Sequence, residues 1–223
     1  MKILTIGDVV SKQGCDYLLQ NLPQIKKEFG ADITIVNGEN SAVGNGVTPL
    51  SADAIFSAGA DVITLGNHAL RRPEIYDYLD EHEYIIRPAN YHASAPGRGV
   101  TYIDKGFATA AIINLQGIAF LEPHRNPFDI IDSLIDEAKE HGASVIIIDF
   151  HGEATGEKKA FGFYVDGRVS AVFGTHTHVQ TSDNQVLPNG TGYISDIGMT
   201  GPYCSVLGVS PERAVEKMRT GLP

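Results

Sequence analysis

Acidic, amide and imidazole side chains follow the ends of short apolar runs in this sequence. The seven such residues are Asp8, Glu39, Asn40, Asn67, His151, His176 and His178. A set that mixes carboxylate oxygen, amide oxygen and imidazole nitrogen suits Mn, Fe, Zn or Co better than Ca. Seven protein donors are also more than one divalent ion needs, so the set predicts two ions about 3.5–4 Å apart.

The spacing of the donors indicates how two ions would share them. Glu39 lies in a loop in the middle of the set, so its carboxylate is the natural bridge between the ions. His176 and His178 are two residues apart in a loop after a strand, so one segment supplies an imidazole to each ion. Glycines precede the donors at positions where we expect sharp turns of the backbone: Gly7, Gly38, Gly66 and Gly174.

Taken one at a time, most of these residues have simpler interpretations. Asp8 after a strand is more often a turn residue or a helix N-cap, and Asn40 and Asn67 belong to a common class of turn formers. His151 alone would be interpreted as an ordinary structural histidine. The prediction of a metal centre therefore depends on a coincidence: all seven donors follow strand ends of the same polarity.

Short β-branched runs are the elements that must position these donors. The runs that predict strands lie at residues 3–6, 33–36, 62–65, 145–148 and 169–173. Continuous runs of this kind are typical of strands buried on both faces of a parallel or mixed sheet. Ligands of open α/β sheets bind beyond the carboxyl ends of the strands, which is where all seven donors lie.

The rest of the chain predicts helices and a meander of strands. Helical spacing or helix-start signals mark residues 18–29, 48–59, 73–79 and 130–138. Between residues 100 and 121, runs at 100–103, 109–115 and 118–121 are joined by tight turns, which favours antiparallel neighbours. We therefore predict a mixed α/β fold, with residues 1–223 forming a single domain.

Composition excludes several classes of protein. Lys and Arg number 17 against 27 Asp and Glu, so the net charge of −10 argues against binding of bulk nucleic acid. Two cysteines are too few for a disulfide scaffold or a Cys-based zinc site. The glycine-rich stretch at residues 44–49 has Pro49 where a dinucleotide-binding fingerprint needs its third glycine, so a dinucleotide-binding site of that kind is excluded. Asp8 interrupts any secretory signal, and no run reaches the ~20 apolar residues of a membrane span, so we expect a cytoplasmic protein that binds no membrane.

Five motifs, taken in order, carry a resemblance to a known family. They are Gly7-Asp8, Asn37-Gly38-Glu39-Asn40, Gly66-Asn67-His68, Phe150-His151 and Gly174-Thr175-His176-Thr177-His178. Together they resemble the YmdB-like family of calcineurin-like metallophosphoesterases, over essentially the whole chain. The resemblance implies a four-layer α/β/β/α sandwich with mixed sheets. Because family members usually continue beyond the position of Pro223, we expect shortened C-terminal strands.

The resemblance also implies a role for each motif residue. One ion would be held by Asp8, Glu39, Asn40 and His178, and the other by Glu39, Asn67, His151 and His176. His68 would be the general acid that protonates the leaving oxygen. The implied activity is metal-dependent hydrolysis of cyclic nucleotides of the 2′,3′-cyclic AMP class by a hydroxide that bridges the two ions. We expect Fe or Mn, or both, with Zn, Mg and Co as alternatives, and a homo-oligomer that binds a small phosphodiester.

Two positions depart from the family pattern. Val10 stands where the superfamily usually has a histidine, and Asn40 completes the metal shell instead. After His68 the chain reads Ala69-Leu70-Arg71-Arg72, where the family usually continues Thr-Trp-Asp-Asn, so two cations replace an acidic neighbour. Two alternative functions stay open: a broader phosphatase or nuclease of the same superfamily, and a non-catalytic, metal-binding regulatory scaffold.

Three further residues have two interpretations each, and a fourth has one. Glu153 is either a residue of the first turn of a helix or a partner of the His151 imidazole. His92 and His124 lie either at the mouth of the substrate site or simply on the surface. Asp196 is a weaker candidate for a residue that borders the site.

Overall fold

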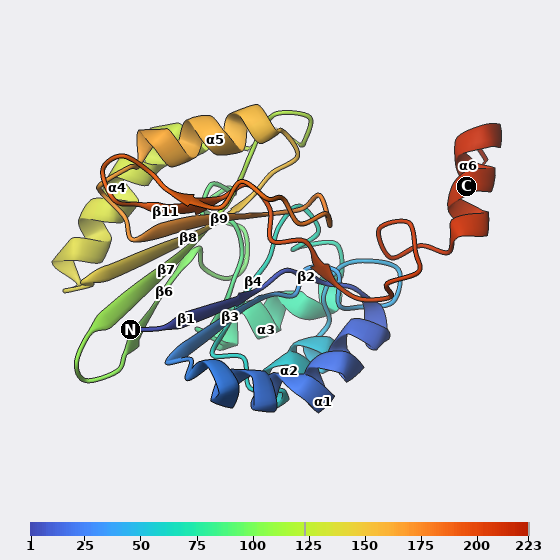
Figure 1. The fold of residues 1–223 in the computed structure, drawn as a ribbon, viewed down its shortest axis with the longest axis horizontal. Helices are drawn as coiled ribbons and strands as arrows, with labels where there is room; N and C mark the ends of the chain where they lie inside the picture. The colour runs from blue at the N-terminus through green and yellow to red at the C-terminus, as the bar shows by residue number, and fades with distance from the viewer. Residues whose placement is uncertain (123, 223) are drawn as a thin grey trace.

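Two β-sheets face each other in the computed structural model, which describes residues 1–122 and 124–222 (Figure 1). The first sheet has the order β1-β3-β4-β5 and is entirely parallel. Its strands are β1 (Ile3–Ile6), β3 (Ile33–Asn37), β4 (Val62–Thr64) and β5 (Ile85–Ile86). Each pair is joined through a helical connection, as parallel pairing requires.

The second sheet is mixed and has the order β10-β11-β9-β8-β7-β6. Its strands are β6 (Val100–Asp104), β7 (Thr109–Gln116), β8 (Val145–His151), β9 (Ala171–Thr175), β10 (Gln185–Val186) and β11 (Gly192–Ile194). The four central strands are parallel, and the edge strands β6 and β10 are antiparallel to their neighbours. A separate parallel pair joins β2 (Asp8–Val9) to β12 (Met199–Thr200).

Helices cover the outer face of each sheet (Figure 1). The first sheet is covered by α1 (Ser11–Phe29), α2 (Pro49–Ser57), η1 (Pro73–Ile75) and α3 (Tyr76–Glu81). The second is covered by α4 (Pro127–Glu140) and α5 (Thr155–Tyr164), whereas α6 (Pro211–Thr220) projects away from the sandwich. The layers therefore run α/β/β/α, as the resemblance implied.

Alternation along the strands explains why the sheets stack. Ile33 and Ile35 of β3 pack in the apolar layer between the sheets, with Ala110 and Ile112 of β7. Val36 of β3 points the other way, into the layer beneath the helices of the first sheet. Since successive side chains of a strand face opposite sides, one apolar run supplies both layers.

One predicted strand is wrong. Residues 118–121 form a turn, and β7 pairs with β8 on one side and with β6 on the other. The backbone N–H groups of Ile118 and Ala119 donate instead to the carboxylate of Glu157, at 2.9 and 3.2 Å. A side chain on α5 thus satisfies the donors that a strand would have paired.

Among the described helices, none combines the length and apolar composition that a membrane crossing needs.

Candidate metal centre

The carboxyl ends of the central strands meet at one edge of the sandwich, and the predicted donors lie there. Asp8 belongs to β2, Glu39 and Asn40 follow β3, and Asn67 follows β4. His151 ends β8, and the segment with His176 and His178 follows β9. The structure thus brings all seven predicted donors together from five strands, in two contacting clusters.

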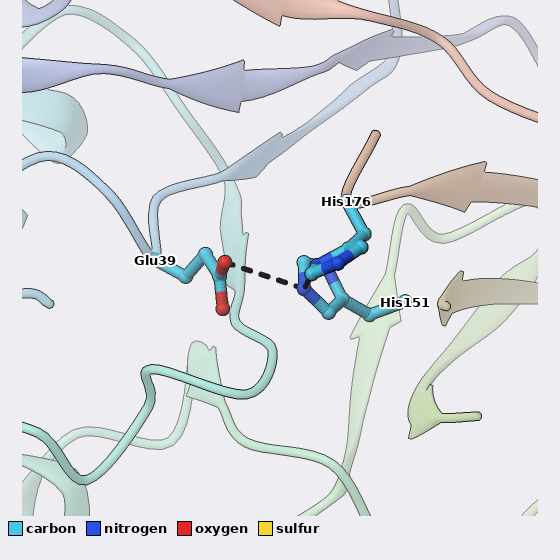
Figure 2. Close-up of side chains that lie close together, drawn as sticks. All are labelled: Glu39, His151 and His176. Carbon is cyan, nitrogen blue, oxygen red and sulfur yellow. Dashed lines mark hydrogen bonds and ion pairs between the residues drawn. The ribbon is translucent and has the colours of Figure 1, made fainter. Parts of the chain in front are cut away.

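The first cluster, here called the His151 cluster, consists of Glu39, Asn67, His151 and His176. Nε2 of His151 lies 3.2 Å from Oε1 of Glu39, 2.9 Å from Oδ1 of Asn67 and 3.0 Å from Nδ1 of His176. Figure 2 shows the Glu39 carboxylate directed at the two imidazoles, which meet nearly edge to face at an interplanar angle of 81°. One ligand atom each from Glu39, His151 and His176 lie within 4.8 Å of one another, close enough for one ion to hold all three.

The second cluster, here called the Asp8 cluster, consists of Asp8, Asn40 and His178. Nε2 of His178 lies 3.2 Å from Nδ2 of Asn40 and 3.6 Å from Oδ1 of Asp8. Nδ2 of Asn40 also donates to Oε1 of Glu39 at 3.0 Å. Glu39, a member of the His151 cluster, therefore contacts the Asp8 cluster as well. Asn40 presents its amide nitrogen to Asp8 and Glu39, and a half-turn of the amide would present its oxygen there.

Charge is balanced within the clusters by protons on imidazoles. Asp8, Glu39 and His151 are fully buried, where an unpaired carboxylate would be costly. Burial alone would raise the pKa of Glu39, but His151 and His68 hold this pKa well below its ordinary value. Burial alone would lower the pKa of His151, but Glu39 raises it to about 9. Burial and the neighbouring His151 lower the pKa of His176 to about 4. Divalent cations fit this donor set, because they would supply the same positive charge.

The two histidines of the segment after β9 have strained backbones. The φ angles are 106° at His176 and 62° at His178, values uncommon for residues other than glycine. The N–H of His176 donates to Oδ2 of Asp8 at 3.1 Å, and the N–H of Thr177 donates to Oδ2 of Asp196 at 3.0 Å. Asp196 is therefore buried beneath this segment and holds it by a hydrogen bond.

The four glycines before the donors allow close approach rather than a special turn. None of the four has a positive φ. A Cβ on Gly66 would collide with the His151 ring, and one on Gly174 would collide with the carbonyl group of Ser195. The backbone does turn after Gly38 and Gly66, at residues 39–40 and 67–70, but glycine is required at these positions by close packing and not by a positive φ.

His68 lies beside both clusters and opens onto a cavity. Its N–H donates to Oε2 of Glu39 at 3.0 Å, and its Nδ1 lies 3.0 Å from Oδ1 of Asn40. The cavity measures about 780 Å³ and is lined by residues that include Asn67, Arg71, Tyr91, His92, Phe120 and His124. His92 and His124 thus both line this cavity.

Several residues of the site have roles that the sequence did not indicate. Tyr91 stacks on His124, with ring centroids 4.0 Å apart, and Phe120 is 88% exposed beside the cavity. Glu153 contacts Nε2 of His176 at 3.1 Å, whereas the expectation linked it to His151. Asp149 is fully buried in β8, and burial raises its pKa to about 6. A carboxylate within an otherwise apolar run was the only signal for Asp149.

Comparison with known proteins shows what the chain is similar to. The model of a family described as YmdB-like protein matches residues 4–223. A 2′,3′-cyclic-nucleotide 2′-phosphodiesterase of Bacillus subtilis (strain 168) is 48% identical over 223 residues, covering 100% of this chain and 84% of the relative. The crystal structure of a novel phosphatase from Mycoplasma pneumoniae has a TM-score of 0.91 at 34% identity, covering 100% of this chain and 80% of that chain.

More distant structures share the fold alone. A 5′-nucleotidase precursor from Thermus thermophilus has a TM-score of 0.62 at 11% identity, over 89% of this chain and 49% of that chain. The fold is therefore shared by chains whose sequences have diverged widely. At this level of identity the likeness carries no assignment of substrate.

Proposed function

The chain belongs to the YmdB-like protein family, and we propose that it is a dinuclear metal-dependent phosphodiesterase that hydrolyses 2′,3′-cyclic nucleotides. The coarser class, a phosphoric ester hydrolase, follows from the relatives in Bacillus subtilis and Mycoplasma pneumoniae. One observation carries the proposal: Glu39 contacts both the His151 cluster and the Asp8 cluster, as a carboxylate shared by two ions would.

In this proposal the two clusters hold one divalent ion each. The Asp8 cluster with Glu39 would hold the first ion, and the His151 cluster would hold the second. When bound, two such ions neutralise charge on a phosphodiester and make hydroxide available near neutral pH. The mixed oxygen and nitrogen donors suit Fe and Mn, and also Zn and Co.

His68 is the residue that we propose as the proton donor to the leaving oxygen. Its side chain is 22% exposed, so it contacts both the cavity and the buried Glu39. The side-chain amide of Asn40 lies 3.0 Å from Nδ1 of His68, and in either orientation of the amide this contact orients the ring and leaves Nε2 for the substrate. His92 and His124 line the same cavity, but neither makes a contact of this kind with Glu39 among the described residues.

The cavity beside His68 is where we propose that the nucleoside part of the substrate binds. Its volume of about 780 Å³ falls within the usual range for small-molecule sites. Phe120 offers an exposed aromatic face on which a base would stack, and Arg71 offers a cation for the phosphate. Arg71 is one of the two cations that stand where the family pattern has an acidic neighbour of His68.

Turnover of several phosphoesters by the metal-loaded protein tests the proposal. We expect a higher kcat/KM for 2′,3′-cyclic AMP than for 3′,5′-cyclic AMP, for nucleotide monoesters or for RNA. Faster turnover of monoesters or RNA would instead favour the broader phosphatase or nuclease. If the Mn-loaded and Fe-loaded proteins hydrolyse none of these substrates, the regulatory scaffold is the correct interpretation.

A further inference from the structure

We propose that Asp149 and Thr175 are positioning residues that keep the proton of the neutral His151 imidazole on Nδ1, so that Nε2 faces the other donors with a free lone pair. This inference rests on the proposed function, because it assumes that Nε2 of His151 is a metal ligand. Neither residue touches the substrate cavity, and both act through His151.

The hydroxyl of Thr175 determines which nitrogen of His151 carries the hydrogen, because a hydroxyl has only one hydrogen to donate. Oγ1 of Thr175 donates to Oδ1 of Asp149 at 2.7 Å. Nδ1 of His151 lies 2.8 Å from the same Oγ1. Because the hydroxyl hydrogen is directed at Asp149, Oγ1 accepts from His151, and Nδ1 must carry the hydrogen. In a neutral ring Nε2 then has a lone pair, directed at Glu39, Asn67 and His176.

Asp149 is fixed as an acceptor by the opposite sheet. Its other oxygen, Oδ2, accepts from Oγ1 of Thr64 at 2.5 Å and from Nδ2 of Asn37 at 3.1 Å. Asn37 and Thr64 belong to the first sheet, whereas Asp149 and Thr175 belong to the second, and all four side chains are buried. These two donors occupy Oδ2, and the ionised carboxylate has no hydrogen to present, so Oδ1 accepts from Thr175.

Zinc binding tests the inference, because zinc is diamagnetic and the bound imidazoles are visible by NMR. We expect Thr175→Val to weaken one of the two zinc sites by about 10- to 100-fold, as loss of a hydrogen-bond partner of a ligating histidine does. Thr175→Ser, which keeps the hydroxyl, should restore binding close to wild type. Thr34→Val is the matched control, because the buried hydroxyl of Thr34 has no partner among the described residues.

Asp149→Asn provides a signature that a purely structural role would not give. The new amide would turn its oxygen toward Thr64 and Asn37 and donate from its nitrogen to Oγ1 of Thr175. The Thr175 hydroxyl would then donate to Nδ1 of His151, which moves the ring hydrogen to Nε2. We expect nitrogen-15 spectra of the zinc-loaded wild type to show a protonated Nδ1 on His151. In Asp149→Asn that signal should be lost, together with occupancy of one zinc site.

The outcomes separate this inference from the proposed function. If the wild type binds no zinc through His151, the proposed metal centre fails and the inference fails with it. If the wild type binds two zinc ions, and Thr175→Val and Asp149→Asn bind both equally well with Nδ1 still protonated, only this inference is overturned. Circular dichroism establishes that each variant is folded, and if Thr175→Val is not, Asp149→Asn and Thr175→Ser decide.

Discussion

Nζ of Lys158 lies 2.8 Å from Oδ2 of Asp196, an ion pair in which both side chains are buried beneath the segment that carries His176 and His178. Lys158 also donates to the carbonyl oxygen of Thr175 at 2.8 Å. Helix α5 is thereby tied to both sides of this segment. The segment with the strained φ angles at His176 and His178 is therefore held by this buried ion pair, in addition to the hydrogen bond from the N–H of His176 to Asp8.

Removal of this pair should damage both stability and the metal centre. Lys158→Met leaves Asp196 buried without a counter-charge, which typically costs ~3–5 kcal/mol of unfolding free energy. We expect chemical denaturation to show a loss of this size and elemental analysis to show reduced metal content. Lys159→Met is the control, since Lys159 is less buried and has no ion pair within the described residues. Equal effects of the two substitutions would contradict the role of the pair.

Glu39→Ala and Asn40→Ala should differ in the number of ions that they remove. Glu39 contacts both clusters, so its truncation should strip both ions, whereas truncation of Asn40 should weaken only the ion of the Asp8 cluster. Metal stoichiometry of the purified variants, measured side by side, checks this expectation. If the two variants lose the same amount of metal, Glu39 is not a shared ligand.

His68→Ala should separate catalysis from metal binding. Loss of a general acid typically lowers turnover by ~10²- to 10⁴-fold. The proposed ligands are left intact, so the variant should keep both ions and its kcat should fall. Steady-state kinetics and elemental analysis on the same preparation test this prediction. An unchanged kcat with both ions bound would exclude His68 as the acid.

Metal affinity should rise with pH. His151, with a pKa of about 9, is protonated at pH 7 in the metal-free protein, and its proton must leave before Nε2 can bind an ion. His176, with a pKa of about 4, is already neutral and releases none. We expect affinity of the His151 cluster for zinc to rise about tenfold per pH unit between pH 6 and 8, one proton being released per ion. Calorimetry in buffers of different ionisation enthalpy counts that proton, and a count of zero would refute the prediction.

Phe120→Ala should weaken recognition of the base and spare the chemistry. Stacking of a base on an aromatic ring is worth ~1–3 kcal/mol, so KM for 2′,3′-cyclic AMP should rise about tenfold. The effect should be absent with glycerol 1,2-cyclic phosphate, which has the ester ring but no base. Phe107→Ala, at an exposed ring in the turn between β6 and β7, is the control. A rise in KM for both substrates would argue against stacking.

The strands and the donors at their ends could be predicted from the sequence, because both are indicated by residues that lie close together in the chain. β-branched runs marked β3 and β8, and the polar residues after them had to reach the same edge of a parallel sheet. Asp149 and its partners were not predicted, because their hydrogen bonds join residues 85 and 112 positions apart in the chain. Contacts of this kind leave no periodicity. The turn at 118–121 was missed for the same reason, since its donors are satisfied by Glu157 on a later helix.

The pairing of β2 with β12 has a consequence for biosynthesis. Asp8 is aligned with Met199, and its N–H donates to the carbonyl oxygen of Gly198 at 3.1 Å. Asp8 is translated early, and the strand β12 that holds it is translated near the end of this chain. The proposed metal centre can therefore be completed only after residue 200 has emerged, so a nascent or prematurely terminated chain would carry an incomplete set of donors.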